Sequence, residues 1–459
     1  MGLDASTGSG ESRVGDAAYY AIAIGVGAIA GLIGTVFHLG TDAISDWPHL
    51  LHGLDLGFLP RIAVMGVITA AMVALSVWLV RTFAPEAAGS GVQEIEGAME
   101  GLRTVVWWRV LPVKFFGGLL SLGSGLVVGR EGPTIHMGAA VAQAASQWLG
   151  LSVRDTRGLL AAGGAAGLAA AFNAPLAAIL FVIEETRRQF PYGLRTYTAV
   201  ILCSVTGAIV TESIAGVGPD MLIQVPEMPL LALPAFIGLG IILGVVGVAF
   251  NATLIWSLDT ARTIGMRTSF YVFPALVGLL IGVLLVVRPE ATLGGEKLAV
   301  TLAHEQLPLL ILAGIVLIRF VMTMASYSTG VPGGVFAPIL ALATAIGVLY
   351  ASVLETFISL PQGMLAGLAV AAMGGLFASA VRAPLVGMVL VVELTGAYSL
   401  LVPVILTAVS ANVVAEALGG RPLYEMLLER TLRLAGQTPP PPPAEEAIGG
   451  WDERERRPD

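Results

Sequence analysis

Long runs without any charged residue constrain this chain more than any other feature. No Asp, Glu, Lys or Arg occurs in residues 158–183, 228–258, 321–354 or 356–381. Each run is longer than the roughly 20 apolar residues with which a helix crosses a bilayer. Of the 459 residues only 12% are charged and 56% are hydrophobic, whereas a soluble domain has about 25% charged residues. We therefore predict an all-α polytopic membrane protein embedded in a lipid bilayer.

Polar segments at both ends of the chain bound a single membrane domain. Residues 1–18 are polar and acidic and lack the basic and apolar regions of a cleavable signal, so we predict a cytoplasmic N-terminal tail there. The membrane domain is predicted over 19–436, with repeat halves of about 19–215 and 228–420 and a C-terminal helix at 421–436. Residues 437–459 are proline-rich and then charged, which is typical of a disordered tail.

An internal repeat divides this domain into two halves. Residues 114–133 align without gaps to residues 319–338, and the alignment pairs Lys114 with Arg319 as well as several glycines and a proline. Paired segments that glycine and proline interrupt are the sequence sign of a transport site at the interface between repeats. We therefore expect the two halves to meet around such a site.

A glutamate lies where one of the repeated helices starts. Glu131 stands in the stretch Gly129-Arg130-Glu131-Gly132-Pro133, ahead of an apolar helix. Ionisable residues at membrane depth mark ion or proton pathways, and the N–H groups at a helix start favour an anion. The repeat pairs Glu131 with Phe336, which leaves bare backbone N–H groups in the second half. Two such helix starts facing each other would bind an anion through partial charges only, so that a permeating ion could leave again.

A second pair of segments repeats further along the chain. Residues 173–184 align to 382–393, which pairs Glu184 with Glu393. Glu185 follows directly and makes Glu184 part of a pair of adjacent carboxylates at the end of an apolar run. From the residues alone this pair is either a charged helix end or a proton acceptor.

Four ordered motifs resemble those of the CLC family of chloride channels and transporters. The resemblance covers about residues 17–435 and implies a CLC-type inverted repeat of tilted and broken helices. It also implies a homodimer in which each subunit has its own pore. The segments that carry it are 89–97 (GSGVQEIEG, similar to the first anion loop), 129–133 (GREGP), 333–338 (GGVFAP) and 419–424 (GGRPLY, similar to the segment with the site's tyrosine).

The resemblance implies a role for individual residues. The anion would be bound by the hydroxyls of Ser90 and Tyr424 and by backbone N–H groups around Val335 and Phe336. Glu131 would be the gating glutamate and outer proton station. Glu185 would be the inner proton-transfer glutamate, which marks exchangers. The supporting residues would be Gly89, Gly91, Gly129, Arg130, Gly132, Pro133, Gly334 and Glu184.

Gln93 departs from the family's pattern, and Lys114 is a charged residue within an apolar segment. Gln93 stands where the family usually has proline, so the loop before its helix is expected to be less rigid. Lys114 is buried by its position in an apolar segment, and we expect it to pair with an acid such as Glu96 in a structural role.

The resemblance favours proton-coupled chloride antiport, with chloride and protons as partners. The protein would lie in the cell (inner) membrane. Both termini would be cytoplasmic, since arginines, which are typical of cytoplasmic loops, gather near 187–195 and 421–433. A passive voltage- or pH-gated chloride channel is the alternative. No enzymatic activity is expected, because the 5 histidines form no metalloprotease or triad pattern. We expect no cofactor and no metal, and the net charge of -8 argues against nucleic acid.

Overall fold

The computed structural model describes residues 14–50, 57–216, 218–219, 221–305 and 307–438. Most of the predicted N-terminal tail and nearly all of the predicted C-terminal tail lie outside the described residues. The first helix, α1, begins at Asp16, slightly before the predicted start of the membrane domain. The last described helix, α18, runs from Leu423 to Leu434, within the predicted C-terminal helix.

Helices make up almost all of the described chain. Those of the first half are α1 Asp16–Ser45, α2 Trp47–Leu50, α3 Phe58–Phe83, α4 Val92–Glu100, α5 Trp107–Gly123, α6 Glu131–Leu149, α7 Val153–Phe172, α8 Pro175–Glu185 and α9 Leu194–Ala215. Those of the second half are α10 Leu233–Arg267, α11 Val272–Val287, α12 Glu296–His304, α13 Leu309–Tyr327, α14 Phe336–Glu355, α15 Met364–Val381, α16 Pro384–Thr395 and α17 Leu401–Ala417. The fold is all-α with tilted and broken helices, which confirms the predicted fold class.

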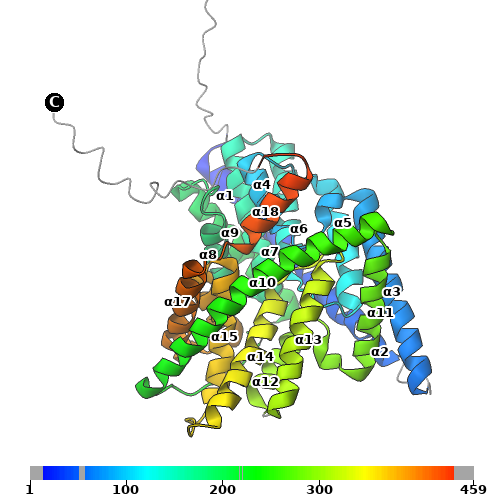
Figure 1. Ribbon diagram of the computed structural model, residues 1–459. Coiled ribbons are helices and arrows are strands. Elements are labelled where there is room, and N and C mark those ends of the chain that lie inside the picture. Colours follow the sequence, from blue (N-terminus) through cyan, green and yellow to red (C-terminus); the bar gives the residue numbers. More distant parts are fainter. Residues whose placement is uncertain (1–13, 51–56, 217, 220, 306, 439–459) are drawn as a thin grey trace, which may run out of the picture.

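The helices differ widely in length, and several cannot cross a bilayer alone. Eight spans in the described chain are long and apolar enough to cross, and α10, with 35 residues, runs obliquely across the molecule in Figure 1. By contrast, α8 has 11 residues and α16 has 12. At about 1.5 Å per residue such helices reach little more than half of a hydrocarbon core of about 30 Å. The uncharged runs of the sequence therefore do not correspond one to one to membrane spans.

Local sequence explains why α7 and α15 end where they do. The residues that follow these two helices, Asn173 and Arg382, adopt the left-handed conformation with φ of 50° and 67°. An Ala-Pro pair follows in each case, and the proline is the first residue of the next helix. Because proline has no N–H and fixes φ, it suits a helix start but not a helix interior.

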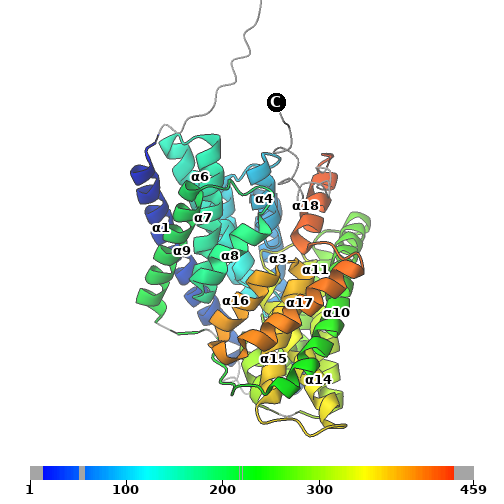
Figure 2. The same ribbon diagram turned by 90° about the vertical axis from the view of Figure 1, so that its left-hand side faces the viewer.

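The predicted repeat is visible in the order and contacts of the helices. In the first half α6 packs on α7, α7 on α9 and α9 on α1, and in the second half α14 packs on α15, α15 on α17 and α17 on α10. The counterparts α7 and α15 are buried along almost their whole length, as expected of helices that are apolar on all sides. Figure 2 shows both between the other helices of their own halves.

Two pseudo-equivalent turns show how closely the halves match. The 3-10 turns η2 Pro85–Ala87 and η4 Pro289–Ala291 each lead through a left-handed glycine into a short helix, α4 or α12. Lys114 donates to the carbonyls of Gly89 and Ser90 at 2.6 and 3.1 Å. Arg319 donates to the carbonyls at the equivalent positions, Leu293 and Gly294, at 3.2 and 2.5 Å. A buried cation therefore holds the same turn in each half.

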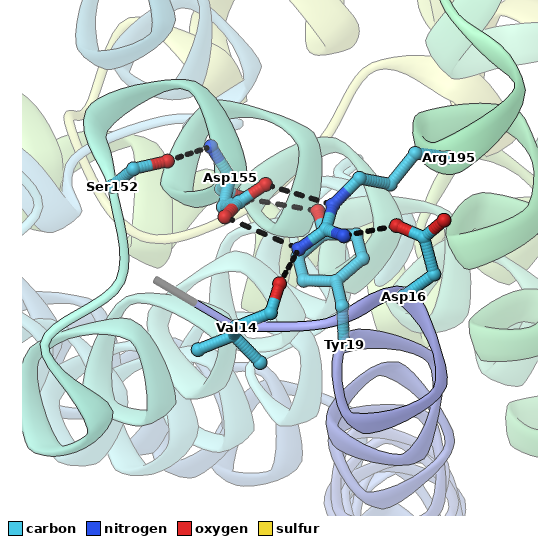
Figure 3. A network of polar contacts seen from close by, with 6 residues as sticks. All are labelled: Val14, Asp16, Tyr19, Ser152, Asp155 and Arg195. Carbon is cyan, nitrogen blue, oxygen red and sulfur yellow. Dashed lines mark hydrogen bonds and ion pairs between the residues drawn. The ribbon is translucent and has the colours of Figure 1, made fainter. Parts of the chain in front are cut away.

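A polar network fixes the start of α1 against α7 and α9 (Figure 3). Arg195 at the start of α9 binds the carboxylates of Asp16 and Asp155, and its guanidinium lies 4.4 Å from the ring centroid of Tyr19. The Tyr19 hydroxyl in turn donates to the backbone carbonyl of Asp155 at 3.0 Å. The network lies at the same end of the molecule as α4 and α18 (Figures 1 and 2).

Candidate functional site

Three glycine turns meet inside the protein and bring the starts of three helices together. Gly89 donates its N–H to the carbonyl of Val331 at 2.9 Å, and Gly333 donates to the carbonyl of Gly89 at 3.1 Å. Gly129 and Gly334 exchange two backbone hydrogen bonds of 2.8 and 2.7 Å. These turns lead into α4, α6 and α14. The two helix starts that the repeat predicted to face each other, at Glu131 and Phe336, do lie together.

The start of α14 forms one wall of the site. Val335 precedes the helix and Phe336 is its first residue, and neither side chain has more than 1% exposure. Val335, the residue before the helix, provides no side-chain cap, so the first backbone N–H groups of α14 can donate to an anion from elsewhere. The Phe336 ring packs edge-on against Phe181 and Phe377, with ring centroids 5.3 and 4.9 Å apart. This aromatic packing excludes water from one side of the helix start.

Ser90 lies in the turn before α4, and its position depends on close backbone approach. Its side chain is 0% exposed, yet its Oγ has no hydrogen-bond partner among the described residues. Gly132 lies so close that a Cβ there would be 2.5 Å from the Ser90 Oγ. Buried hydroxyls almost always have a partner. An unpartnered hydroxyl beside the start of α6 therefore indicates a place for a bound ion or water.

Tyr424, the second residue of α18, brings another hydroxyl to the same place. Its side chain is 0% exposed, and its OH also lacks a hydrogen-bond partner within the described ranges. The Tyr424 ring centroid is 6.0 Å from that of Phe336, and its hydroxyl is close enough to Ser90 for the two to interact. Two buried hydroxyls thus lie beside the start of α14, where the sequence predicts an anion site.

The carboxylate of Glu131 fills the space between the two glycine turns. A Cβ on Gly129 would lie 2.1 Å from its Oε2, and a Cβ on Gly334 would lie 3.3 Å from the same atom. The side chain is 0% exposed, and neither oxygen has a hydrogen bond of ordinary length to the described residues. The carboxylate lies near the N–H of Ala337 in α14. It therefore occupies the position in which a dissolved anion would meet the helix starts.

The adjacent acids Glu184 and Glu185 point to different places. Glu185, the last residue of α8, lies close to Glu96 of α4, and the two carboxyl groups are electrostatic neighbours. Glu425 of α18 is a further charged neighbour of both. Glu184 instead accepts hydrogen bonds from the start of α16.

A cavity of about 590 Å³ is lined by Gly89, Gln93 and Tyr327, which neighbour Ser90 in the chain or contact it, and by residues of α10 and α18. Its charged lining consists of Arg81, Glu86, Glu94, Arg103, Arg262 and Arg430. The excess of arginine makes this vestibule attractive to anions, since walls of one charge raise the local concentration of the opposite ion.

The remaining predicted residues have supporting positions. Gly89 and Gly91 adopt positive φ of 61° and 92°, which glycine tolerates without strain. Arg130 turns away from the site and donates to the carbonyl of Ala171 at 3.1 Å. Pro133 is the third residue of α6, because the helix begins at Glu131 rather than at the proline.

One expected contact is wrong. Lys114 was predicted to pair with an acid such as Glu96, but it donates to two backbone carbonyls of the Ser90 turn. Glu94 is the acid whose charge acts on Lys114. Sequence patterns show side-chain charges but not which carbonyls a turn directs inward, so the true partners could not be read from the motif.

Sequence reasoning also missed Tyr327. Its hydroxyl accepts a 3.3 Å hydrogen bond from the backbone N–H of Ser90, and the residue is buried at the end of α13. No local pattern marks it, because the partners are 237 positions apart. The aligned repeat segment contains it, but its counterpart Leu122 has no polar group to suggest a role.

Known proteins share this architecture over most of the chain. The H(+)/Cl(-) exchange transporter ClcA of Vibrio cholerae is 44% identical over 425 residues, which cover 89% of this chain and 88% of that protein. A slow cyanobacterial Cl-/H+ antiporter solved by X-ray crystallography matches with a TM-score of 0.85 and 36% identity, covering 91% of this chain and 99% of that chain. A eukaryotic CLC transporter matches with a TM-score of 0.77 and 25% identity, and the match covers 90% of this chain and 74% of that chain.

Fold and site together define an integral membrane protein built on an inverted repeat, with broken helices that start at a buried polar site. Residues 72–416 match the family described as voltage gated chloride channel. The chain belongs to this family, the CLC family, as the motifs predicted.

Proposed function

We propose that this protein exchanges chloride for protons across the cell membrane. The observation that carries the proposal is the placement of two acids around one site. Glu131 fills the space between the two glycine turns, Glu185 is the last residue of α8, and Tyr424 is an electrostatic neighbour of both. The names of the relatives, an exchange transporter and an antiporter, support the same activity.

In the proposed mechanism chloride enters through the arginine-lined vestibule and reaches the Ser90 turn. The hydroxyls of Ser90 and Tyr424 and the N–H groups near Val335 and Phe336 donate hydrogen bonds to the ion. No full positive charge contacts it, so binding remains weak enough for release. Charge-assisted hydrogen bonds of this kind contribute about 1.5–3 kcal/mol each.

Glu131 couples the two ions because its carboxylate and chloride compete for the same space. When Glu131 is charged it occupies the gap between Gly129 and Gly334, and when it takes up a proton the charge that holds it there is lost. Protons reach it from the inner side by way of Glu185, which has the second acid Glu96 as a close neighbour. Each turnover therefore moves a proton against chloride.

A passive chloride channel is the second candidate, and the description of the matching family favours it. The two functions differ in whether chloride flow can drive protons uphill. We propose exchange because a channel has no need for an acid at the position of Glu185.

Liposomes that contain the purified protein test the proposal directly. An outward chloride gradient should drive proton uptake against the proton gradient. Glu185→Gln should abolish proton uptake while chloride flux continues, and Glu131→Ala should uncouple the two ions as well. Chloride flux without proton movement in the wild-type protein would establish the channel instead.

We further propose a homodimer in the inner membrane with both termini in the cytoplasm. Helices α8, α9, α16 and α17 carry exposed apolar side chains, among them Leu176, Ile209, Leu385 and Val409. The partly exposed carboxylates of Glu184 and Glu393 lie among them, and charges that face lipid are costly. A second copy that covers this face removes them from lipid. A monomeric mass in mild detergent would contradict the dimer.

A further inference from the structure

The carboxylate of Glu393 holds the start of a helix in the other half of the protein. Glu393 lies near the end of α16, and its Oε1 and Oε2 accept the backbone N–H groups of Leu176 and Ala177 at 3.0 and 2.7 Å. These are the second and third residues of α8. The residue before α8 is Ala174, which has no side-chain acceptor and makes no cap of its own.

The reverse contact repeats this arrangement in the other direction. Glu184, near the end of α8, accepts the N–H groups of Leu385 and Val386 at the start of α16, at 3.2 and 2.8 Å. The residue before α16 is again an alanine, Ala383, without a cap of its own. The two helices lie against each other, and each supplies the acceptor that the other lacks.

This exchange of carboxylates separates the roles of two neighbouring acids. Successive residues on a helix point about 100° apart. With Glu184 fixed on α16, Glu185 is directed to the other side, where it meets Glu96. Both oxygens of Glu184 are occupied by N–H donors at the positive end of a helix dipole, which favours the charged form. Glu185 has no such restraint from the helix start.

We propose that Glu184 and Glu393 form a reciprocal clamp between α8 and α16 that positions Glu185 for proton transfer. Both are positioning residues, because each accepts hydrogen bonds from the start of the other helix. The inference rests on the proposed exchange function, since it assigns the means by which the inner proton station is held. It also explains why the repeat keeps an acid at 184 and at 393, although only the first half has an acid at the next position.

Simultaneous recordings of chloride and proton flux in liposomes test the clamp. Glu184→Ala and Glu393→Ala should each lower the ratio of proton to chloride flux about fivefold, the factor that corresponds to loss of one helix cap. Glu184→Gln and Glu393→Gln should keep most of the ratio, because the amide oxygen still accepts from the helix start. The matched control is Glu416→Ala, an exposed acid near the end of α17 that pairs with Arg382 at 3.2 Å.

The double variant adds a further check on the mechanism. Because both carboxylates act on one pair of helices, replacing both by alanine should lower the flux ratio little more than either change alone. The clamp is overturned if the alanine variants keep the wild-type ratio. It is equally overturned if Glu184→Gln removes proton flux as completely as Glu185→Gln does, because Glu184 would then carry the proton.

Amide hydrogen exchange separates failure of the clamp from failure of the proposed function. The amides of Leu176 and Ala177 should exchange about fivefold faster in Glu393→Ala than in the wild type, and Glu393→Gln should restore their protection. This measurement does not depend on proton transport. Absence of proton coupling in the wild type would overturn the exchange function, whereas unchanged amide exchange in Glu393→Ala would overturn the clamp.

Discussion

A single methyl group at Gly132 is expected to disrupt the anion site. An alanine Cβ there would lie 2.5 Å from the Ser90 Oγ, 2.7 Å from the Ser90 Cα and 3.0 Å from the Gly334 Cα. Carbon atoms pack best about 3.5–4.0 Å apart, so the Ser90 turn must move by about 1 Å. Overpacking of this kind costs about 1–3 kcal/mol. The greater helix propensity of alanine offsets about 1 kcal/mol of it at most.

The same displacement changes chloride binding more than stability. A movement of about 1 Å takes the Ser90 hydroxyl out of hydrogen-bond range of a bound ion, and such a bond contributes about 1.5–3 kcal/mol. Chloride affinity should therefore fall about 10- to 150-fold in Gly132→Ala. Calorimetric titration of chloride into the detergent-solubilised protein measures this directly.

A matched glycine provides the control for this experiment. An alanine Cβ at Gly164 in α7 would lie 3.5 Å from the Ile135 side chain, an ordinary contact distance. Gly164→Ala should therefore keep wild-type chloride affinity. If Gly132→Ala also binds chloride within about twofold of the wild type, the Ser90 turn does not hold the ion and the reasoning fails.

Three further predictions address the surroundings of the site. Chloride at 100 times its Kd should raise the free energy of unfolding of the purified protein by about 2.7 kcal/mol, because the Ser90 and Tyr424 hydroxyls gain a partner. Gluconate should have no such effect, and equal effects of both anions in thermal unfolding would count against the site. Lys114→Met should lower the thermal unfolding midpoint far more than Lys297→Met, which changes an exposed position. Two buried carbonyls lose their donor in Lys114→Met, and each unpaired carbonyl costs about 1–3 kcal/mol of stability. Equal shifts of the midpoint in the two variants would contradict this. Arg195→Ala should speed proteolytic cleavage before α1 without changing chloride flux, and unchanged cleavage would show that the network of Figure 3 does not hold α1.

The repeat made much of this site predictable from the sequence. The paired helix starts at Glu131 and Phe336 and the paired cations Lys114 and Arg319 were evident from one gapless alignment. Turn chemistry supports this, because glycine permits the left-handed backbone of these turns and proline fixes φ at a helix start. The motifs therefore placed the helix starts, and α6 begins at Glu131 itself.

Contacts between distant segments could not be predicted in this way. Glu96 was expected to meet Lys114, yet it meets Glu185 from α8. Whether Glu185 faces inward depends on how α8 is rotated, and that rotation is set by hydrogen bonds to α16 some 200 residues away. Side-chain orientation of this kind follows from packing between halves, which a one-dimensional pattern does not contain.

The two halves share a backbone plan but differ in where they carry acids. The counterpart of Glu131 is Phe336, and the counterpart of Glu185 is Leu394. Both proposed proton stations therefore belong to the first half, while the second half presents apolar side chains at the same positions. In the proposed mechanism Phe336 leaves the start of α14 to chloride, because a second carboxylate fixed there would repel the anion at the adjacent N–H groups. The symmetric scaffold supplies helix starts on both sides of the site. On the proposed roles, the asymmetric side chains would assign protons to one half and leave the anion at the junction.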